Sequence, residues 1–217
     1  MGGDGRCENL SMAATEEQMG RYTSETARAL LEEWTAGDSL RKHARSVAAC
    51  TEAYGRLEGL RMGLSGEELE SFTDRYACVG LLHDMDYERH PSTEEHPFVA
   101  VKYLREQGWP EEMLHAILAH ADYSGVKPET HLDRALFACD ELAGFLTACA
   151  LVKPTKCIAD VEVAGVKKKM KDKAFARAVK REDMIAGAEM LGVPLEQHVA
   201  TCLVAMQARA EELGLAG

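Results

Sequence analysis

The chain has 217 residues, of which 46% are hydrophobic and 28% are charged, a composition typical of a globular protein with a sizeable core. Its net charge of −11 argues against general nucleic-acid binding, which needs a basic surface to neutralise phosphates. No apolar run reaches the roughly 18 residues that a membrane span requires. The N-terminal segment also lacks the basic region and apolar core of a signal peptide, and its glycine and polar content predicts a flexible leader over residues 1–14.

The first half of the chain has a helical pattern. Ala, Leu, Glu, Lys, Arg and Met dominate, and no run alternates between apolar and polar residues, so we predict an all-α fold. Asp38 or Ser39 is a suitable N-cap for the second helix. The first three predicted helices span residues 15–35, 39–60 and 73–82.

The second half continues this pattern without an internal repeat or a long linker. Ser92 and Glu95 resemble a capping box that would begin a fourth helix, which ends at Gly108. After a basic, less regular stretch that follows Pro154, two final helices complete a single all-helical domain over 15–217. The remaining predicted helices span residues 110–120, 131–152, 182–191 and 195–213.

The cysteines indicate a reducing compartment. There are seven, an odd number, and none forms a CxxC pair, which argues against thiolate zinc fingers and thioredoxin-like chemistry. Five of them lie in apolar helical stretches, where a free thiol behaves as a small hydrophobic group: Cys50, Cys78, Cys139, Cys149 and Cys202. We therefore expect reduced, structural cysteines and a cytoplasmic location.

Three short fragments place polar groups where an apolar helix face is expected. Helical spacing puts His43 on one face with Val47 and Cys50, and puts Asp140 on one face with Leu136. The pair His83-Asp84 closes an apolar helix. Burying such groups costs several kcal/mol unless they are paired or bind a metal.

Each fragment also has an ordinary interpretation. A single inward histidine is more often a hydrogen-bonded core residue, and an inward aspartate can be held by a buried arginine or by backbone donors. Two imidazoles and two carboxylates together, however, suit a divalent first-row metal. The joint pattern therefore favours a metal site.

The ordered set of His43, His83-Asp84 and Asp140 resembles the HD superfamily of metal-dependent phosphohydrolases. The resemblance covers residues 39–150 and includes the segment LLHDMDYE. It implies a helical HD-type bundle in which one metal ion is held by His43, His83, Asp84 and Asp140. In members with two metals, a histidine after the pair and another one helix later complete a second site, and His96 and His120 occupy those places, with Asp84 bridging the two ions.

The C-terminal extension, residues 151–217, is similar to a bacterial subgroup of predicted HD hydrolases. This similarity extends the resemblance to nearly the full length but names no reaction. For the whole chain the resemblance implies one or two divalent ions (Mn, Fe, Co, Ni, Zn or Mg) and attack of metal-bound water on the phosphate of a small metabolite or nucleotide. The negative net charge and the lack of a long apolar run predict that neither a nucleic-acid polymer nor a membrane is a partner.

Other residues are candidates for the chemistry around the metals. Asp84 would act in catalysis by holding both ions. Glu141, beside Asp140, could orient a metal-bound water or a ligand histidine, or could equally be a surface carboxylate. Asp86 and Tyr87 would line the mouth of the site. Many HD phosphohydrolases have a phosphate-contacting lysine near this position, and this sequence has none.

A phosphate substrate needs positive charge in addition to the metal ions, and the basic residues of this chain are concentrated after the helix that carries Asp140. Lys153 and Lys156 are the nearest basic residues in sequence and are our candidate substrate anchors. A solvated charged face is the ordinary interpretation of this basic segment.

Two other functions are alternatives to the leading hypothesis of a phosphohydrolase. A few HD-fold proteins are di-iron oxygenases that use the same six-ligand set, and histidine with carboxylate accepts both Mn and Fe. A non-catalytic metal-binding sensor module is the third hypothesis, although the intact ligand set counts against it.

Overall fold

The computed structural model describes residues 22–217, and within this range it contains helices and no strand. The prediction of an all-α fold is therefore confirmed. The predicted leader and the first residues of the first predicted helix lie outside the described range. The division into a metal-binding core at 39–150 and an extension at 151–217 stays a prediction.

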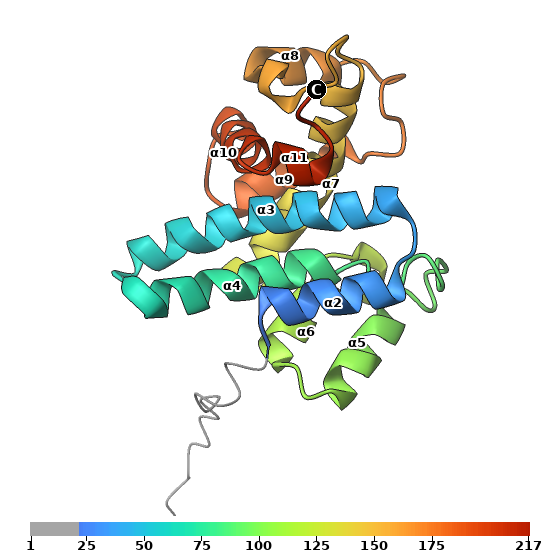
Figure 1. The fold of residues 1–217 in the computed structure, drawn as a ribbon, viewed down its shortest axis with the longest axis vertical. Coiled ribbons are helices and arrows are strands. Elements are labelled where there is room, and N and C mark those ends of the chain that lie inside the picture. The colour runs from blue at the N-terminus through green and yellow to red at the C-terminus, as the bar shows by residue number, and fades with distance from the viewer. Residues whose placement is uncertain (1–21) are drawn as a thin grey trace, which may run out of the picture.

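The described helices occupy most of the chain and agree in order with the predicted ones (Figure 1). The first five are α2 (Ser24–Trp34), α3 (Asp38–Arg61), α4 (Gly66–Leu82), α5 (Phe98–Glu106) and α6 (Glu111–Ala119). After the 3₁₀ turn η1 (Asp122–Ser124) comes α7 (His131–Leu151), and after η2 (Ile158–Asp160) come α8 (Val163–Met170), α9 (Arg181–Met190), α10 (Leu195–Gln207) and α11 (Ala210–Leu213).

Helices α3 and α4 form a long antiparallel pair, and α2 packs against α4 (Figure 1). Small residues allow the close approach: a Cβ atom added at Gly80 would lie 2.5 Å from the Cα atom of Ala48. Gly80 is one turn before His83, and Ala48 is little more than one turn after His43. This contact therefore fixes the distance between two helices that carry candidate ligands.

Helix α7 joins the two ends of the molecule. It packs against α3, α4 and α6 and also against α8, α9 and α10, and Figure 1 shows it passing behind α3 toward the C-terminal helices. Thr130 and Asp133 form a capping box at its start, where each side chain accepts a backbone N–H. Its inward face contributes large buried side chains, including Phe145 and Leu142, to the hydrophobic core.

The region before α5 corrects one sequence prediction. Residues 93–97 form turns, and α5 begins only at Phe98, six residues after Ser92. Pro97 has no N–H with which to continue a helix from Ser92, so the helix starts after it. The predicted capping box is replaced by a hydrogen bond from the Ser92 hydroxyl to the Glu95 carboxylate at 3.1 Å.

Other boundaries differ from the prediction for local reasons. The third predicted helix begins at Gly66 instead of residue 73, and the basic stretch after Pro154 contains the regular helix α8. The last predicted helix is two helices, because the chain turns at Arg209 between α10 and α11. All six cysteines within the described residues are free thiols.

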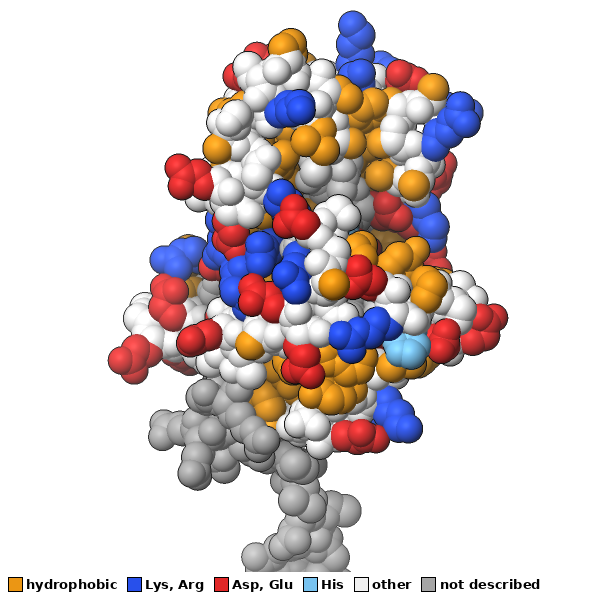
Figure 2. Space-filling view, turned by 45° about the vertical axis from the view of Figure 1, so that its right-hand side comes forward, with side chains coloured by type: hydrophobic (Ala, Val, Ile, Leu, Met, Phe, Trp, Pro, Cys, Tyr) orange, Lys and Arg blue, Asp and Glu red, His pale blue; other side chains and the backbone are white. Residues whose placement is uncertain are grey.

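The surface mixes charges of both signs. Figure 2 shows one face of the molecule, on which lysine and arginine side chains lie among aspartate and glutamate side chains. Within residues 22–217, no helix is both long enough and apolar enough to cross a membrane.

Candidate metal centre

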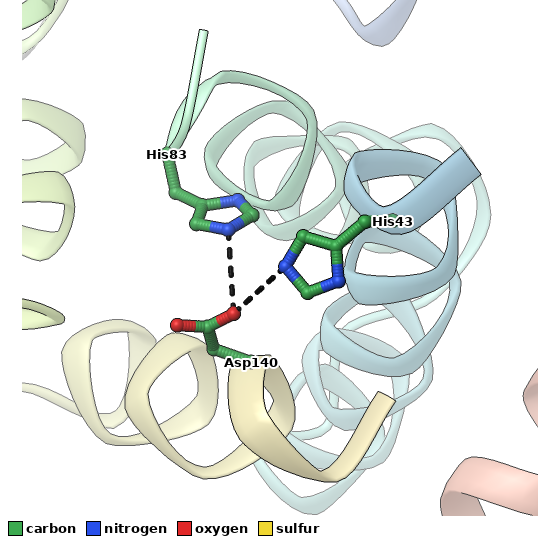
Figure 3. A group of neighbouring side chains, drawn as sticks. All are labelled: His43, His83 and Asp140. Atoms are coloured by element: carbon green, nitrogen blue, oxygen red, sulfur yellow. Dashed lines mark hydrogen bonds and ion pairs between the residues drawn. The ribbon is translucent and has the colours of Figure 1, made fainter. Parts of the chain in front are cut away.

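His43 lies near the start of α3 and Asp140 in the middle of α7, and the two side chains face each other where these helices pack together. The Nε2 atom of His43 lies 3.0 Å from Oδ1 of Asp140 (Figure 3). The two residues are 97 positions apart in sequence. The inward direction predicted for each of them is therefore correct, and both point into one site.

His83 is the C-cap residue of α4 and is fully buried. Its Nδ1–H donates to the carbonyl oxygen of Gly80 at 2.9 Å, which leaves the lone pair of Nε2 directed into the site. This Nε2 atom has no hydrogen-bond partner and lies 3.4 Å from Oδ1 of Asp140 (Figure 3). A cation held between this buried lone pair and the carboxylate oxygens would satisfy both.

Asp84 presents a different oxygen to each of two groups of imidazoles. Its Oδ2 atom lies 3.4 Å from Nε2 of His83 and 3.9 Å from Nε2 of His43. Its Oδ1 atom lies 3.2 Å from Nε2 of His96 and 3.6 Å from Nε2 of His120. One carboxylate thus connects the two groups.

His96 is held by a buried carboxylate behind it. Its Nδ1–H donates to Oδ1 of Asp86 at 2.7 Å, and the other oxygen of Asp86 accepts the Ala100 N–H at 2.7 Å. His120 ends α6, and its Nδ1–H donates to the Ile117 carbonyl at 2.5 Å. In both residues this fixes the tautomer whose Nε2 lone pair faces Asp84.

Two groups of three residues therefore have the spacing of metal ligands. Within the described residues, the donor atoms of His43, His83 and Asp140 all lie within 4.8 Å of one another, as do those of Asp84, His96 and His120. Four neutral imidazoles and two carboxylates form a donor set that suits a divalent first-row metal. The unpartnered Nε2 of His83 is the atom that such an ion would satisfy.

The electrostatics show how strongly this site attracts positive charge. Burial by itself would lower the pKa of His83, but the carboxylates of Asp84 and Asp140 outweigh it and raise this pKa well above its usual value. Burial would raise the pKa of Asp140, but His83 and His43 hold it far below its usual value. The pKa of His96 is raised to about 9, because Asp84 and Asp86 outweigh its burial. Bound cations would take the place of these protons.

Comparison with protein families agrees with this geometry. A family model described as HD domain matches residues 40–144, a range that contains all six candidate ligands. Residues 40–144 form an HD domain. The family consists mostly of metal-dependent phosphohydrolases. The comparisons with curated proteins and with solved structures each gave no match to the chain.

Five of the six candidate ligands, all but His83, line a cavity of about 390 Å³. Tyr87 lines it, with its ring 5.2 Å from the ring of His96, and Tyr123 lies beside the same histidine. Glu141 also lines the cavity and accepts the backbone N–H of Lys180 at 3.2 Å. Burial, together with the charge of Asp140, raises the pKa of Glu141 to about 7.

The structure does not bring the two predicted substrate anchors to this cavity. Lys153 lies 13 residues beyond Asp140, which corresponds to roughly 20 Å along a helix axis, and it lines a second cavity near α8. Lys156 lies still further along the chain and lines neither cavity. Nearness in sequence was a poor guide here, because α7 carries the chain away from the metal ligands.

The residues around the ligands include several that sequence reasoning placed wrongly or missed. Asp86 does not line the mouth of the site but is fully buried behind His96. Asp122, Lys180 and Asp183 line the cavity from η1 and the start of α9. None of them lies within a regular apolar pattern, so no periodic signal in the sequence indicates their position.

Proposed function

We propose that this HD-domain protein is a metal-dependent phosphohydrolase that cleaves the phosphate ester of a small metabolite or nucleotide. The observation that supports this most directly is the carboxylate of Asp84, whose two oxygens face different pairs of imidazoles. A carboxylate in this position suits a bridge between two ions, the arrangement that stabilises both the entering and the leaving oxygen of a phosphoryl transfer.

The two groups of donors divide the ligands between two ions. His43, His83 and Asp140 would hold one, and Asp84 would join it to a second held by His96 and His120. When bound, divalent ions act as Lewis acids on a phosphoryl oxygen and lower the pKa of a coordinated water.

The protein's own residues supply the positioning. The carbonyls of Gly80 and Ile117 and the carboxylate of Asp86 fix the imidazoles, so the donors need no rearrangement during the reaction. We assign Glu141 to orient the water molecule that attacks phosphorus, because its carboxylate lines the cavity beside Asp140. Tyr87 forms part of the wall against which the rest of the substrate lies.

Phosphate release is the direct test. Protein purified without added metal, then supplied with Mn²⁺ or Co²⁺, should release phosphate from members of a panel of phosphomonoesters and nucleotides. Asp84→Asn and His83→Gln should lower the rate at least about a hundredfold, because each removes a donor to an ion. His90→Gln is the matched control, since His90 pairs with Glu95 and belongs to neither group of donors.

Two outcomes would contradict the proposal. Tightly held iron, dioxygen consumption and no phosphate release would favour a di-iron oxygenase with the same donors. Absence of bound metal in the purified protein and unchanged stability of the Asp84→Ala protein would favour a non-catalytic module.

A further inference from the structure

Lys180 is the one lysine or arginine among the described residues that line the cavity next to the metal ligands. It is the N-cap residue of α9, and its backbone N–H donates to Glu141, the neighbour of Asp140. This main-chain hydrogen bond fixes the position of Lys180 beside the candidate metal centre.

The ammonium group of Lys180 is held by two carboxylates at the rim of the cavity. Its Nζ atom lies 3.3 Å from Oδ2 of Asp122 and 3.7 Å from Oδ2 of Asp183. Asp122 is two residues after the candidate ligand His120, so this ion pair connects the start of α9 to the segment that ends α6. The lysine side chain is 58% exposed, and exposed ion pairs at these distances are weak.

Phosphate at such a centre needs a cation besides the metal ions. Lysine is a flexible point charge that serves as a phosphate donor in many proteins. Because its ion pairs with the rim carboxylates are weak, little free energy is lost when the Lys180 side chain turns from them to a phosphoryl oxygen.

We propose that Lys180 anchors the phosphoryl group of the substrate and that Asp122 and Asp183 restrict the substrate to one phosphoryl group. The assignment rests on the proposed hydrolase function. The described lining of the cavity offers one cation, which can pair with one phosphoryl group, and it offers no second cation for a further phosphate. A second or third phosphate would place further negative charge against Asp122 and Asp183. The substrate class is therefore a small phosphomonoester, not a nucleoside di- or triphosphate.

Binding of inorganic phosphate to the Mn²⁺-loaded protein, measured by calorimetry, tests the anchor without relying on turnover. Lys180→Met keeps the aliphatic chain but removes the charge, and should weaken phosphate binding roughly tenfold or more with metal content unchanged. Lys173→Met is the matched control, because Lys173 is exposed in the same basic segment and lines neither cavity. Equal phosphate affinity of the Lys180→Met protein and the wild type would overturn the anchor.

Hydrolysis of the mono-, di- and triphosphate of one nucleoside tests the restriction. The wild type should prefer the monophosphate in kcat/KM, and Asp183→Asn should shift this ratio several-fold toward the triphosphate. An unchanged ratio, or a wild type that prefers the triphosphate, would overturn the substrate class. If no phosphate ester is hydrolysed but phosphate binding still depends on Lys180, the hydrolase proposal fails while the anion site stands.

Unfolding midpoints of the variants provide a control for folding. Comparison with the midpoint of Lys173→Met separates loss of the phosphate anchor from loss of the fold.

Discussion

Single atoms decide which side of each imidazole faces the site. His83, His96 and His120 all donate their Nδ1–H to an oxygen behind them, so each presents an Nε2 lone pair to Asp84. Two of these oxygens are main-chain carbonyls, those of Gly80 and Ile117, each three residues before the histidine. A histidine at the end of a helix always has such a carbonyl nearby. The third is Asp86, and its role could not be inferred from its place in the sequence.

The support that Asp86 gives to His96 leads to a first prediction. Asp86→Ala removes the acceptor of both the His96 imidazole N–H and the Ala100 main-chain N–H. The affinity of the second ion should fall by about 10- to 100-fold, as is usual when the group behind a ligand histidine is lost. Metal content after dialysis against a weak chelator measures this, and should fall from two ions per chain toward one.

The control for this prediction is Asp183→Asn. Asp183 is also near the cavity but contacts no ligand histidine, so the substitution should leave the metal content unchanged. Full retention of both ions by the Asp86→Ala protein would show that His96 is oriented without Asp86.

At the scale of elements, the distance between α3 and α4 sets the distance between His43 and His83. The absence of a side chain at Gly80 permits this close contact with Ala48. Gly187 plays the same part between α9 and α7, since a Cβ atom there would lie 2.5 Å from the Cα atom of Ala138. The α9 contact places Lys180 and Asp183 over the cavity.

Gly80→Ala should therefore destabilise the protein by about 1–3 kcal/mol, the usual cost of extra volume in a tightly packed contact. Denaturant unfolding measures this change, and metal affinity should fall with it because the helices move apart. Gly165→Ala is the matched control: Gly165 lies inside α8 with no atom within 4 Å of an added Cβ. That substitution should stabilise the protein by about 0.4–1 kcal/mol, because alanine restricts the unfolded chain. Equal effects of the two substitutions would contradict the role of close packing.

At the scale of the whole molecule, the metal centre joins segments that are far apart in sequence. The six candidate ligands come from α3, the ends of α4 and α6, the turn before α5, and the middle of α7. No local segment of the unfolded chain brings them together, so binding of metal at this site would be coupled to folding.

Removal of the metals should lower the unfolding temperature. At a free metal concentration of about a thousand times the dissociation constant, binding to the folded state alone adds about 4 kcal/mol. For a domain of this size that corresponds to about 8–16 °C. Thermal unfolding with and without a chelator measures the difference. The Asp84→Ala protein should show little change on chelation, and an equal shift in this variant would place the stabilising ion elsewhere.

The helical fold could be predicted from helix-forming residues with apolar periodicity, and the candidate ligands His43, His83 and Asp140 from polar groups that interrupt an apolar face. His96 and His120 could be predicted only through the resemblance to the HD superfamily. The start of α5 was misplaced because Pro97 outweighed the capping signal at Ser92. The residues that surround the candidate ligands became evident from the packing of the helices. Asp86 and Lys180 reach the site through turns and the packing of α9, whereas Lys153 is carried away from it by the length of α7, and neither effect leaves a periodic pattern in the chain.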